Sequence, residues 1–575
     1  MRAAVGYLAR YRRRYAVGIA LLLLATGLSL GIPWTVQRAI DALAAGAGRA
    51  GVLAPVGLIL LLAAANGAAR LGSRLAIVGG AQRIEHDLRA HLYASLLRYP
   101  PAWFVGQSTG DLMARAGSDA AAVRSLLGFG VVSLVTTAAA FVGGVGAMLA
   151  IDPRLTLVAL APYPLLALGA QRAYARIHAR TEAAQEQLGA VSGVVQEHLA
   201  GMAVVRAYVL ERRALARFTE AHAEYRRRSL ALARTLAAIG PMAGLVSGLG
   251  VLAVLWLGGQ AVIEGRLTLG ALVAFNGYLA YLAWPTLALG YTLSLARRGL
   301  TSMGRVQAVI AGAPPVVESP RTPPLEPPLG IRFDRLTFAY PGRPPVLREV
   351  SFTVEPGRMA VVVGPTGSGK STLAALLVRL WEPPPGTVYL GGRDVRDLPL
   401  ETLRGALGWV PQEAFLFSRS VLDNVTLGRE GISPAAARRA AALAAVADEV
   451  ETFPAGWHTV VGERGLTLSG GQRQRLALGR ALAARPPVLV LDDPFASVDA
   501  AREEEILRGL REAGAGCTVL VMTHRLRAAQ YADQVVVLAG GRVVEVGAHE
   551  ALLARGGLYA RLWRQQQLEA EIARA

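Results

Sequence analysis

The stretch Met359-Ala-Val-Val-Val-Gly364-Pro-Thr-Gly-Ser-Gly-Lys370-Ser371 decides the fold of the carboxyl-terminal part of this chain. It fits G-x-x-x-x-G-K-[ST], directly after a β-branched run and before an apolar helix. In such a phosphate loop the glycines let backbone N–H groups point at phosphate oxygens, the lysine reaches the β- and γ-phosphates, and the serine ligates Mg²⁺. The predicted nucleotide contacts are Gly364, Pro365, Thr366, Gly367, Ser368, Gly369, Lys370, Ser371 and Thr372.

The sequence around the loop alternates short β-branched runs with helical stretches from Ile331 onward. Ala360–Val363, Val488–Leu491 and Thr518–Met522 are typical of buried parallel strands, which predicts an α/β nucleotide-binding domain. Asp492 ends the second of these strands, where a carboxylate can hold Mg²⁺ opposite a phosphate loop. We therefore expect Asp492 and Ser371 to share one metal ion.

The composition sets limits on the rest of the chain. Hydrophobic residues make up 53% of its 575 residues and charged residues 18%, below the usual ~25%, so part of it is expected in lipid. Lys370 is the only lysine among 60 basic residues, which suggests that arginine cannot replace it there. Cys517 is the only cysteine, which excludes an internal disulfide and a cysteine zinc cluster. Only three asparagines occur, which suggests a heat-adapted source.

The first half of the chain contains repeated apolar stretches long enough to span a membrane, which takes about 20 helical residues. The predicted spans are 16–37, 53–79, 127–150, 154–172, 236–260 and 268–295. A cleaved signal peptide is an alternative for the first, but no small-residue cleavage site and secreted domain follow it.

Basic residues flank these spans unevenly. Arginines precede the first span and fill the long connections 80–126 and 173–235, whereas the loops on the other side are short. The positive-inside rule then places both termini in the cytoplasm. The net charge of +19 therefore mainly reflects the membrane topology, which argues against nucleic-acid binding.

The proline-rich stretch 311–330 predicts an extended linker. The expected organisation is a six-helix all-α membrane domain (1–310), this linker, and an α/β P-loop domain (331–575).

The motif Leu468-Ser469-Gly470-Gly471-Gln472 carries a family resemblance. It matches the signature of the ATP-binding cassette (ABC) family, and with the phosphate loop it identifies the chain as similar to ABC proteins. The resemblance implies that ATP is the nucleotide and that the signature contacts the γ-phosphate of ATP held by the opposite subunit. Further matches imply an adenine-stacking aromatic, a Q-loop glutamine near Mg²⁺, a D-loop aspartate and a switch histidine. These residues are Tyr340, Gln412, Asp499 and His524.

Three other segments resemble parts of six-helix exporters. The segment 99–119 is similar to their first intracellular loop, and 197–208 to the second. Thr459–Gly465, which contains Glu463 and Arg464, is similar to the loop by which their cassettes contact coupling helices. The resemblance implies a type IV exporter-like fold over nearly the whole chain.

Asp493 departs from the family pattern, which places glutamate after the strand-ending aspartate. The glutamate orients or deprotonates the attacking water, and aspartate is one methylene shorter. A misplacement of about 1 Å can cost on the order of 10²-fold in rate. We expect this site to bind ATP well and hydrolyse it poorly; the alternative is that local backbone shifts let Asp493 act unaided.

A signature that acts in trans requires two chains, and a homodimer would place Asp493 in both sites. We therefore expect a second half-transporter with a glutamate-containing site, in an asymmetric pair in the cell inner (plasma) membrane. Among such pairs, the chain most resembles one subunit of a heterodimeric multidrug and peptide exporter. The expected cargo is a hydrophobic drug, a lipid or a peptide; the alternative is an ATP-gated channel or regulatory subunit.

Polar and aromatic residues within the spans could line a substrate cavity: Trp34, Arg70, Arg74, Asn276, Tyr278, Tyr281 and Trp284. Tryptophans and tyrosines near span ends, however, are more often interfacial anchors than cavity residues.

Overall fold

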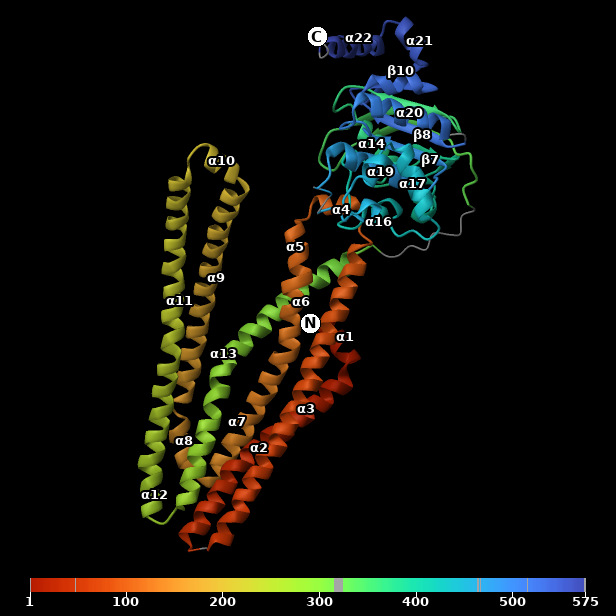
Figure 1. The fold of residues 1–575 in the computed structure, drawn as a ribbon. Coiled ribbons are helices and arrows are strands. Elements are labelled where there is room, and N and C mark those ends of the chain that lie inside the picture. The colour runs from red at the N-terminus through yellow and green to blue at the C-terminus, as the bar shows by residue number, and fades with distance from the viewer. Residues whose placement is uncertain are drawn as a thin grey trace. The chain divides into compact units, whose positions relative to one another are not determined.

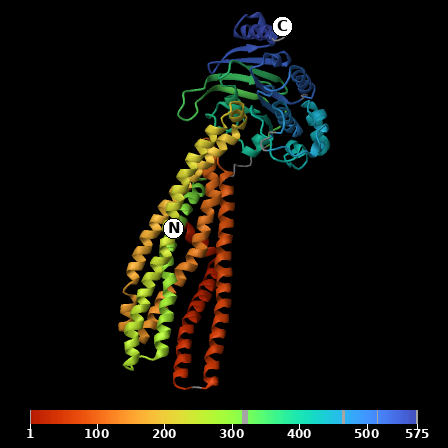
Figure 2. The same cartoon turned by 60° about the vertical axis from the view of Figure 1, so that its left-hand side comes forward.

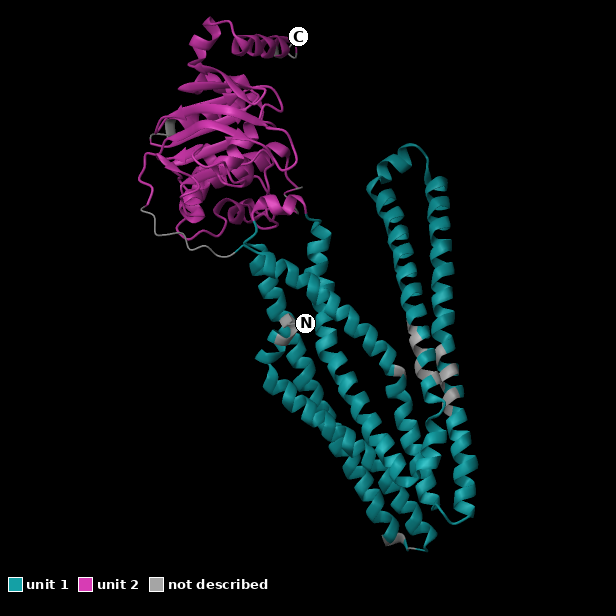
Figure 3. Cartoon of the chain, turned by 180° about the vertical axis from the view of Figure 1, so that it is seen from behind, with its two compact units in different colours: residues 1–99, 107–314 teal, residues 100–106, 315–575 magenta. Residues whose placement is uncertain are grey.

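The computed structural model describes residues 2–46, 48–314, 324–462, 465, 467–513 and 516–572. They form two compact units, coloured differently in Figure 3. The first unit lies within residues 1–99 and 107–314, and the second within 100–106 and 315–575. The segment 100–106 thus groups with the second unit although the chain on both sides of it belongs to the first. It contains the short helix α4 (Pro101–Val105).

The first unit is helical throughout its described elements (Figures 1 and 2). Short π-helical segments, η1 (Arg115–Asp119), η2 (Leu126–Gly130) and η3 (Val254–Gly258), continue neighbouring helices. The α-helices are α1 (Arg2–Arg10), α2 (Arg12–Ala44), α3 (Arg49–Leu96), α5 (Thr109–Ala114), α6 (Ala120–Ser125), α7 (Val131–Ile151), α8 (Pro153–Leu160), α9 (Tyr163–Ala200), α10 (Met202–Ala207), α11 (Glu211–Ala253), α12 (Gly259–Ile263) and α13 (Leu269–Gly312).

Helices cover all six predicted spans. By length and composition, four described stretches can cross a membrane: Arg12–Ala44, Gly51–Leu96, Thr109–Ile151 and Leu269–Gly312. The predicted span 154–172 is divided between α8 and α9, because a turn at Ala161–Pro162 separates them. The predicted span 236–260 runs through α11 and η3 into the shorter apolar stretch Gly248–Ile263.

Helices α9 and α11 lie side by side as a long hairpin with α10 at its tip (Figures 1 and 2). Hydrogen bonds from side chains to backbone carbonyls join the two helices. Arg180 Nη1 donates to Ala231 O at 2.7 Å, and Arg228 Nη1 donates to Ala183 O at 3.0 Å. These arginines hold the hairpin together along the stretch that the sequence predicted to be cytoplasmic.

The second unit contains two sheets. The six-stranded sheet has the order β10-β9-β3-β8-β7-β6, in which only β10 runs antiparallel to its neighbour. The four-stranded sheet has the order β2-β1-β4-β5 and is antiparallel. The strands are β1 (Ile331–Phe338), β2 (Leu347–Val354), β3 (Met359–Val363), β4 (Val388–Leu390), β5 (Arg393–Asp394), β6 (Leu407–Val410), β7 (Val488–Asp492), β8 (Thr518–Thr523), β9 (Gln534–Ala539) and β10 (Arg542–Gly547).

Apolar side chains of the central strand β3 divide between two cores. Val361 and Val363 pack into one cluster with the helices, and Ala360 and Val362 pack into the other with the antiparallel sheet. This alternation follows from the two-residue period of a strand. The α-helices are α14 (Lys370–Leu377), α15 (Leu400–Gly405), α16 (Val421–Thr426), α17 (Pro434–Leu443), α18 (Ala447–Glu451), α19 (Gly470–Ala483), α20 (Ala500–Ala513), α21 (His549–Ala554) and α22 (Leu558–Ile572). The described part of the unit also contains the 3₁₀ helices η4 (Gly456–His458) and η6 (Leu526–Tyr531).

Candidate ATP site

Four neighbouring strands end at the same edge of the parallel sheet. The register pairs Val363 of β3 with Thr523 of β8, Met522 of β8 with Asp492 of β7, and Leu491 with Val410 of β6. The segments after these strands therefore emerge together, and they carry the phosphate loop, His524, Asp493 and Gln412. Ligand sites of open α/β sheets lie at such carboxyl ends.

The phosphate loop takes a form that only glycine allows at two positions. Gly369 has φ of 104°, and a Cβ there would lie 2.6 Å from Leu347 Cδ2. A Cβ on Gly364 would lie 2.0 Å from the carbonyl oxygen of Leu538 in β9. The loop is thus seated against two strands before α14 begins at Lys370.

Lys370 lies over the loop that precedes it. Its Nζ donates to the carbonyl oxygen of Gly364 at 2.7 Å and to that of Pro365 at 3.0 Å. Burial lowers the pKa of this ammonium, while the charges of Asp493 and Asp492 act in the opposite direction. The half-buried cation is placed to bind the β- and γ-phosphates of a nucleotide cradled by the loop.

Ser371 and Asp492 meet as predicted for a shared metal ligand pair. The Ser371 hydroxyl donates to Asp492 Oδ1 at 2.9 Å. Burial raises the pKa of Asp492, although the hydrogen bond from Ser371 opposes the shift. The described residues contain no group of three or more His, Cys, Asp or Glu side chains that could hold a metal. The pair formed by Ser371 and Asp492 fits Mg²⁺, which takes one or two carboxylates together with substrate phosphates and water.

Gln412 and Tyr340 lie at the borders of this site. Gln412 is exposed after β6, and its carbonyl oxygen accepts a 3.4 Å hydrogen bond from Gln474 Nε2. The Tyr340 ring packs edge-on against Trp381, with centroids 4.9 Å apart. Its hydroxyl lies 3.1 Å from Thr372 Oγ1 in α14. These contacts hold the partly exposed aromatic beside the phosphate loop, where an adenine ring could stack.

Asp493 is the most constrained carboxylate of the site. Its φ is 48°, in the left-handed region, and its side chain is buried. Oδ1 accepts a 3.1 Å hydrogen bond from Thr523 Oγ1, and His524 Nδ1 lies 3.2 and 3.1 Å from the two carboxylate oxygens. Gln474 Nε2 donates to the Asp493 carbonyl at 2.8 Å. Both side-chain oxygens therefore already have partners within this chain.

Sequence reasoning missed three residues that support the site. Thr523 and Gln474 fix Asp493, and Gln566 of α22 donates from Nε2 to the His524 carbonyl at 2.6 Å. Thr523 directly precedes His524, so its position carried a local signal. Gln474 and Gln566 come from helices distant in sequence, and no local pattern indicated them.

The signature motif begins α19 through a capping box. Ser469 Oγ accepts from the Gln472 N–H at 3.2 Å, and Gln472 Oε1 accepts from the Ser469 N–H at 3.0 Å. A Cβ on Gly471 would lie 2.6 Å from the Ser497 carbonyl oxygen, so glycine lets α19 approach the D-loop. Leu468 is buried beneath the cap.

Neighbouring residues of the same cassette hold the D-loop and the signature motif in place. Asp499 Oδ1 accepts from the Arg502 N–H at 2.9 Å at the start of α20. Gln472 Nε2 donates to Glu449 Oε2 at 3.1 Å, and the hydrogen bond from Arg475 lowers the pKa of Glu449. Among described residues, no hydrogen bond joins the signature to the phosphate loop. Glu463 and Arg464, predicted to contact coupling helices, lie outside the described residues.

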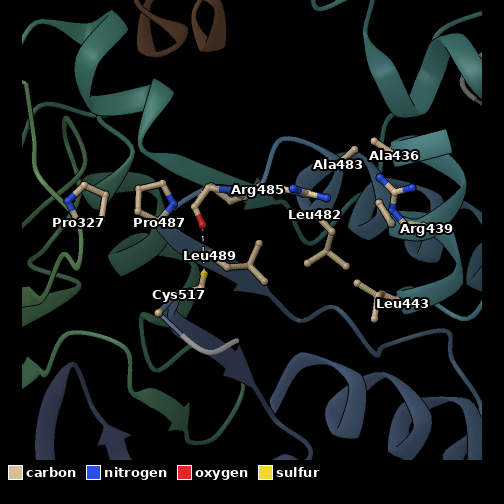
Figure 4. A pocket seen from close by; sticks show the side chains of 13 residues that line it. Pro327, Ala436, Arg439, Leu443, Leu482, Ala483, Arg485, Pro487, Leu489 and Cys517 are labelled. Carbon is tan, nitrogen blue, oxygen red and sulfur yellow. Dashed lines mark hydrogen bonds between the residues drawn. The ribbon is translucent and has the colours of Figure 1, made fainter. Parts of the chain in front are cut away.

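A separate cavity of about 580 Å³ lies in the second unit between α17, the end of α19 and the start of β7 (Figure 4). None of the predicted ATP-site residues lines it. The Cys517 thiol donates to the Pro486 carbonyl at 3.3 Å, and burial raises its pKa to about 11. The thiol in the described lining of this cavity is therefore not activated as a nucleophile.

A second cavity, of about 760 Å³, lies in the first unit and brings together four of the predicted cavity residues: Arg70, Arg74, Tyr281 and Trp284. The other three do not line it. Tyr278 is buried and donates to the Leu30 carbonyl at 3.1 Å, and Asn276 Oδ1 is buried without a partner among the described residues. Trp34 lies under the Arg38 guanidinium, 3.6 Å from its ring centroid.

Comparisons with known proteins agree over nearly the whole length. Residues 15–286 match the family model "ABC transporter transmembrane region", and residues 347–496 match "ABC transporter". The chain is 36% identical to "Probable multidrug resistance ABC transporter ATP-binding/permease protein YheI" of Bacillus subtilis, over 97% of this chain and 96% of that protein. It is 34% identical to the human "Mitochondrial potassium channel ATP-binding subunit", over 89% of this chain and 70% of that protein. A bacterial Atm1-family ABC exporter with ATP bound superposes with a TM-score of 0.78 at 28% identity, covering 97% of this chain and 99% of that one.

Proposed function

Because this chain belongs to the ABC transporter family, as an exporter half-transporter with its membrane domain fused to an ATP-binding cassette, we propose that it is one subunit of a heterodimer. The partner is a second half-transporter with glutamate at the position of Asp493. The pair couples ATP binding and hydrolysis to outward movement of a hydrophobic drug, a lipid or a peptide. The carrying observation is Asp493, a short carboxylate whose two oxygens are engaged by Thr523 and His524.

The chemistry of this site follows from its side chains. In hydrolysis, water attacks the γ-phosphorus, the bond to the β-phosphate oxygen breaks, and a carboxylate orients or deprotonates the water. Lys370 would bind the phosphates, and Ser371, Asp492 and Gln412 would hold Mg²⁺, which neutralises phosphate charge. Asp493 is one methylene too short and is fixed by Thr523 and His524, so this site would bind ATP and hydrolyse it slowly.

The signature of this chain would act on the partner's nucleotide. Ser469 and the amides of Gly470 and Gly471 lie at the N-terminus of a 14-residue helix, which favours an anionic oxygen. The described hydrogen bonds of Ser469 join it to Gln472 at the start of the same helix. The motif would therefore be available to an ATP bound by another chain. ATP binding would close the two cassettes, and the intracellular loops would convert closure into outward opening by differential affinity for the closed state.

The proposed location is the cell inner (plasma) membrane. Arginine-rich connections favour cytoplasmic termini, with residues 1–310 in and below the membrane, 311–330 as linker, and 331–575 as the ATP-binding domain. The proposed division of labour is the one that a resemblance to one subunit of a heterodimeric multidrug and peptide exporter implies.

Three variants of this chain test the asymmetry in the purified complex. Asp493→Asn should change the ATPase rate by less than about twofold, because hydrolysis occurs mostly at the partner's site. Ser469→Arg should reduce the rate by at least about tenfold, because this signature completes that site. Asp493→Glu should raise the rate. The matching Glu→Gln change in the partner is the reference for a full loss. Equal losses in Asp493→Asn and Ser469→Arg would refute the asymmetric assignment.

The 34% sequence identity to the human mitochondrial potassium channel ATP-binding subunit favours one alternative function, that of an ATP-gated channel or regulatory subunit. The two functions differ in whether substrate moves uphill. Sealed inverted vesicles that accumulate a fluorescent drug above its external concentration, only with ATP, support the exporter. ATP-dependent equilibration without accumulation supports the channel.

A further inference from the structure

The cavity in the first unit lies between α2, α3, α7 and α13 and measures about 760 Å³. Among the described residues that line it, the only charged side chains are Arg70 and Arg74, and none is an aspartate or glutamate. The two arginines are four residues apart on α3, so they share one helix face. The described part of the cavity wall therefore carries two positive charges without a compensating carboxylate.

The contacts of these arginines leave their charge unneutralised. Arg70 Nη2 donates to the neutral Ser29 Oγ at 3.3 Å. Arg74 forms no hydrogen bond or ion pair with any part of the chain that the structure describes. A guanidinium stays protonated in proteins. Since an unpaired charge among apolar spans is costly, charged side chains there usually mark a substrate pathway.

The depth of Arg70 argues against a role as an interfacial anchor. Helices α2 and α3 are antiparallel neighbours: Tyr15 lies beside Gly80, and Leu21 beside Gly72. Arg70 is thus level with about residue 24 of α2, some ten residues beyond Arg14, or about 15 Å along a helix. That is about half of a 30 Å hydrocarbon core. The Arg70 side chain reaches Ser29, farther from the basic N-terminal end, rather than back toward it.

The rest of the wall suits an apolar body. Trp284 is 76% exposed, and Phe129 packs edge-on against Tyr291 with centroids 5.8 Å apart. Ser133 pairs its hydroxyl with Thr292 at 2.6 Å. Aromatic faces and paired hydroxyls take up apolar groups, while the arginines supply donors for an anion.

We propose that this cavity binds amphiphiles with an anionic head, a carboxylate or phosphate on an apolar body, with Arg70 and Arg74 as the counter-charges. This proposal rests on the exporter function proposed above, and it specifies the substrate class of that exporter. A soluble organic acid and an anionic lipid offer the same chemistry, so the test has an arm for each.

The test measures equilibrium binding without ATP to the natively assembled complex in nanodiscs. The first arm compares an aromatic dye carboxylate with its uncharged amide, and the second compares fluorescent phosphatidylglycerol with phosphatidylcholine. We expect the anion to bind about tenfold more tightly in at least one arm. Arg70→Gln/Arg74→Gln should abolish that preference without weakening the neutral probe. Arg70→Lys/Arg74→Lys should keep it, which separates charge from folding.

Arg297→Gln/Arg298→Gln is the matched control, because it removes the same charge from exposed positions of α13 outside the cavity. Equal binding of anionic and neutral probes in both arms would overturn the proposal. So would an equal loss of preference in the control. ATP-driven transport is scored separately: a complex that shows the preference but transports nothing supports this site and contradicts the exporter function.

Discussion

Burial changes the acid–base behaviour of single side chains in the second unit. It lowers the pKa of Lys370 and raises that of Asp492, and in both cases the charged form is the one disfavoured. A bound nucleotide and Mg²⁺ would offset this cost by supplying opposite charges. Single-residue chemistry here therefore depends on how deeply the sheet edge buries each group.

Cys517 offers a direct measurement of this effect. Its pKa rises to about 11 from a usual 9.0 because of burial, so its thiolate fraction at pH 8 should be about 100-fold below that of an ordinary thiol. We expect slow alkylation by iodoacetamide, with a rate that rises about tenfold per pH unit up to pH 10. Peptide mass spectrometry follows the reaction, and protein unfolded in urea is the control. A native rate at pH 8 within threefold of the unfolded rate would contradict the prediction.

At the scale of elements, α19 depends on its close approach to the D-loop. The capping box fixes where the helix begins, and Gly471 lets it lie against the Ser497 carbonyl. Helix start and D-loop position are therefore coupled, which links the signature to the segment after Asp493.

Gly471→Ala tests that coupling. The new Cβ would lie 2.6 Å from a backbone oxygen, so we expect a loss of about 1–3 kcal/mol in stability and a lower melting temperature. Gly509→Ala in α20 is the matched control, because its Cβ would meet Leu443 Cδ2 at an ordinary 3.6 Å. The control should be neutral or stabilising. Equal melting temperatures for the two variants would disprove the coupling.

At the scale of the whole molecule, no described part of the first unit covers the tip of the α9–α11 hairpin. Tyr208 is 73% exposed and Val209 79%, and Val209 has φ of 53°. Exposed apolar side chains at a helical tip are typical of an interface, and the proposed partner chain would supply the covering surface.

Val209→Cys in a Cys517→Ala background, labelled with a photoreactive maleimide, locates that surface. We expect an ATP-dependent product with the mass of two chains. Ile263→Cys, 88% exposed at the end of α12, is the control and should give none. A product of single-chain mass alone, identified by peptide mapping as a link to the chain's own cassette, would contradict the expectation.

The sequence by itself determined much of this protein. The α/β cassette, three of its buried strands and the phosphate loop followed from patterns within short stretches, because strand period and turn chemistry are local. The pairing of Ser371 with Asp492, 121 residues apart, was expected only from combining two such patterns, the phosphate loop and a strand that ends in a carboxylate. Apolar length also predicted six spans; helices cover all six, and by length and composition four described stretches can cross a membrane. The asymmetric partner and the impaired site stay predictions, since they concern a second chain.

Only the tertiary structure decided what depends on strand pairing and helix packing. Thr523 and Gln474 hold Asp493 because β8 and α19 meet there, and Gly364 must be glycine because β9 lies against it. The grouping of 100–106 with the second unit and the cavity around Arg70 and Arg74 also arise from contacts distant in sequence. Local spacing carries no information about such contacts, because they are fixed by which surfaces the folded chain buries together.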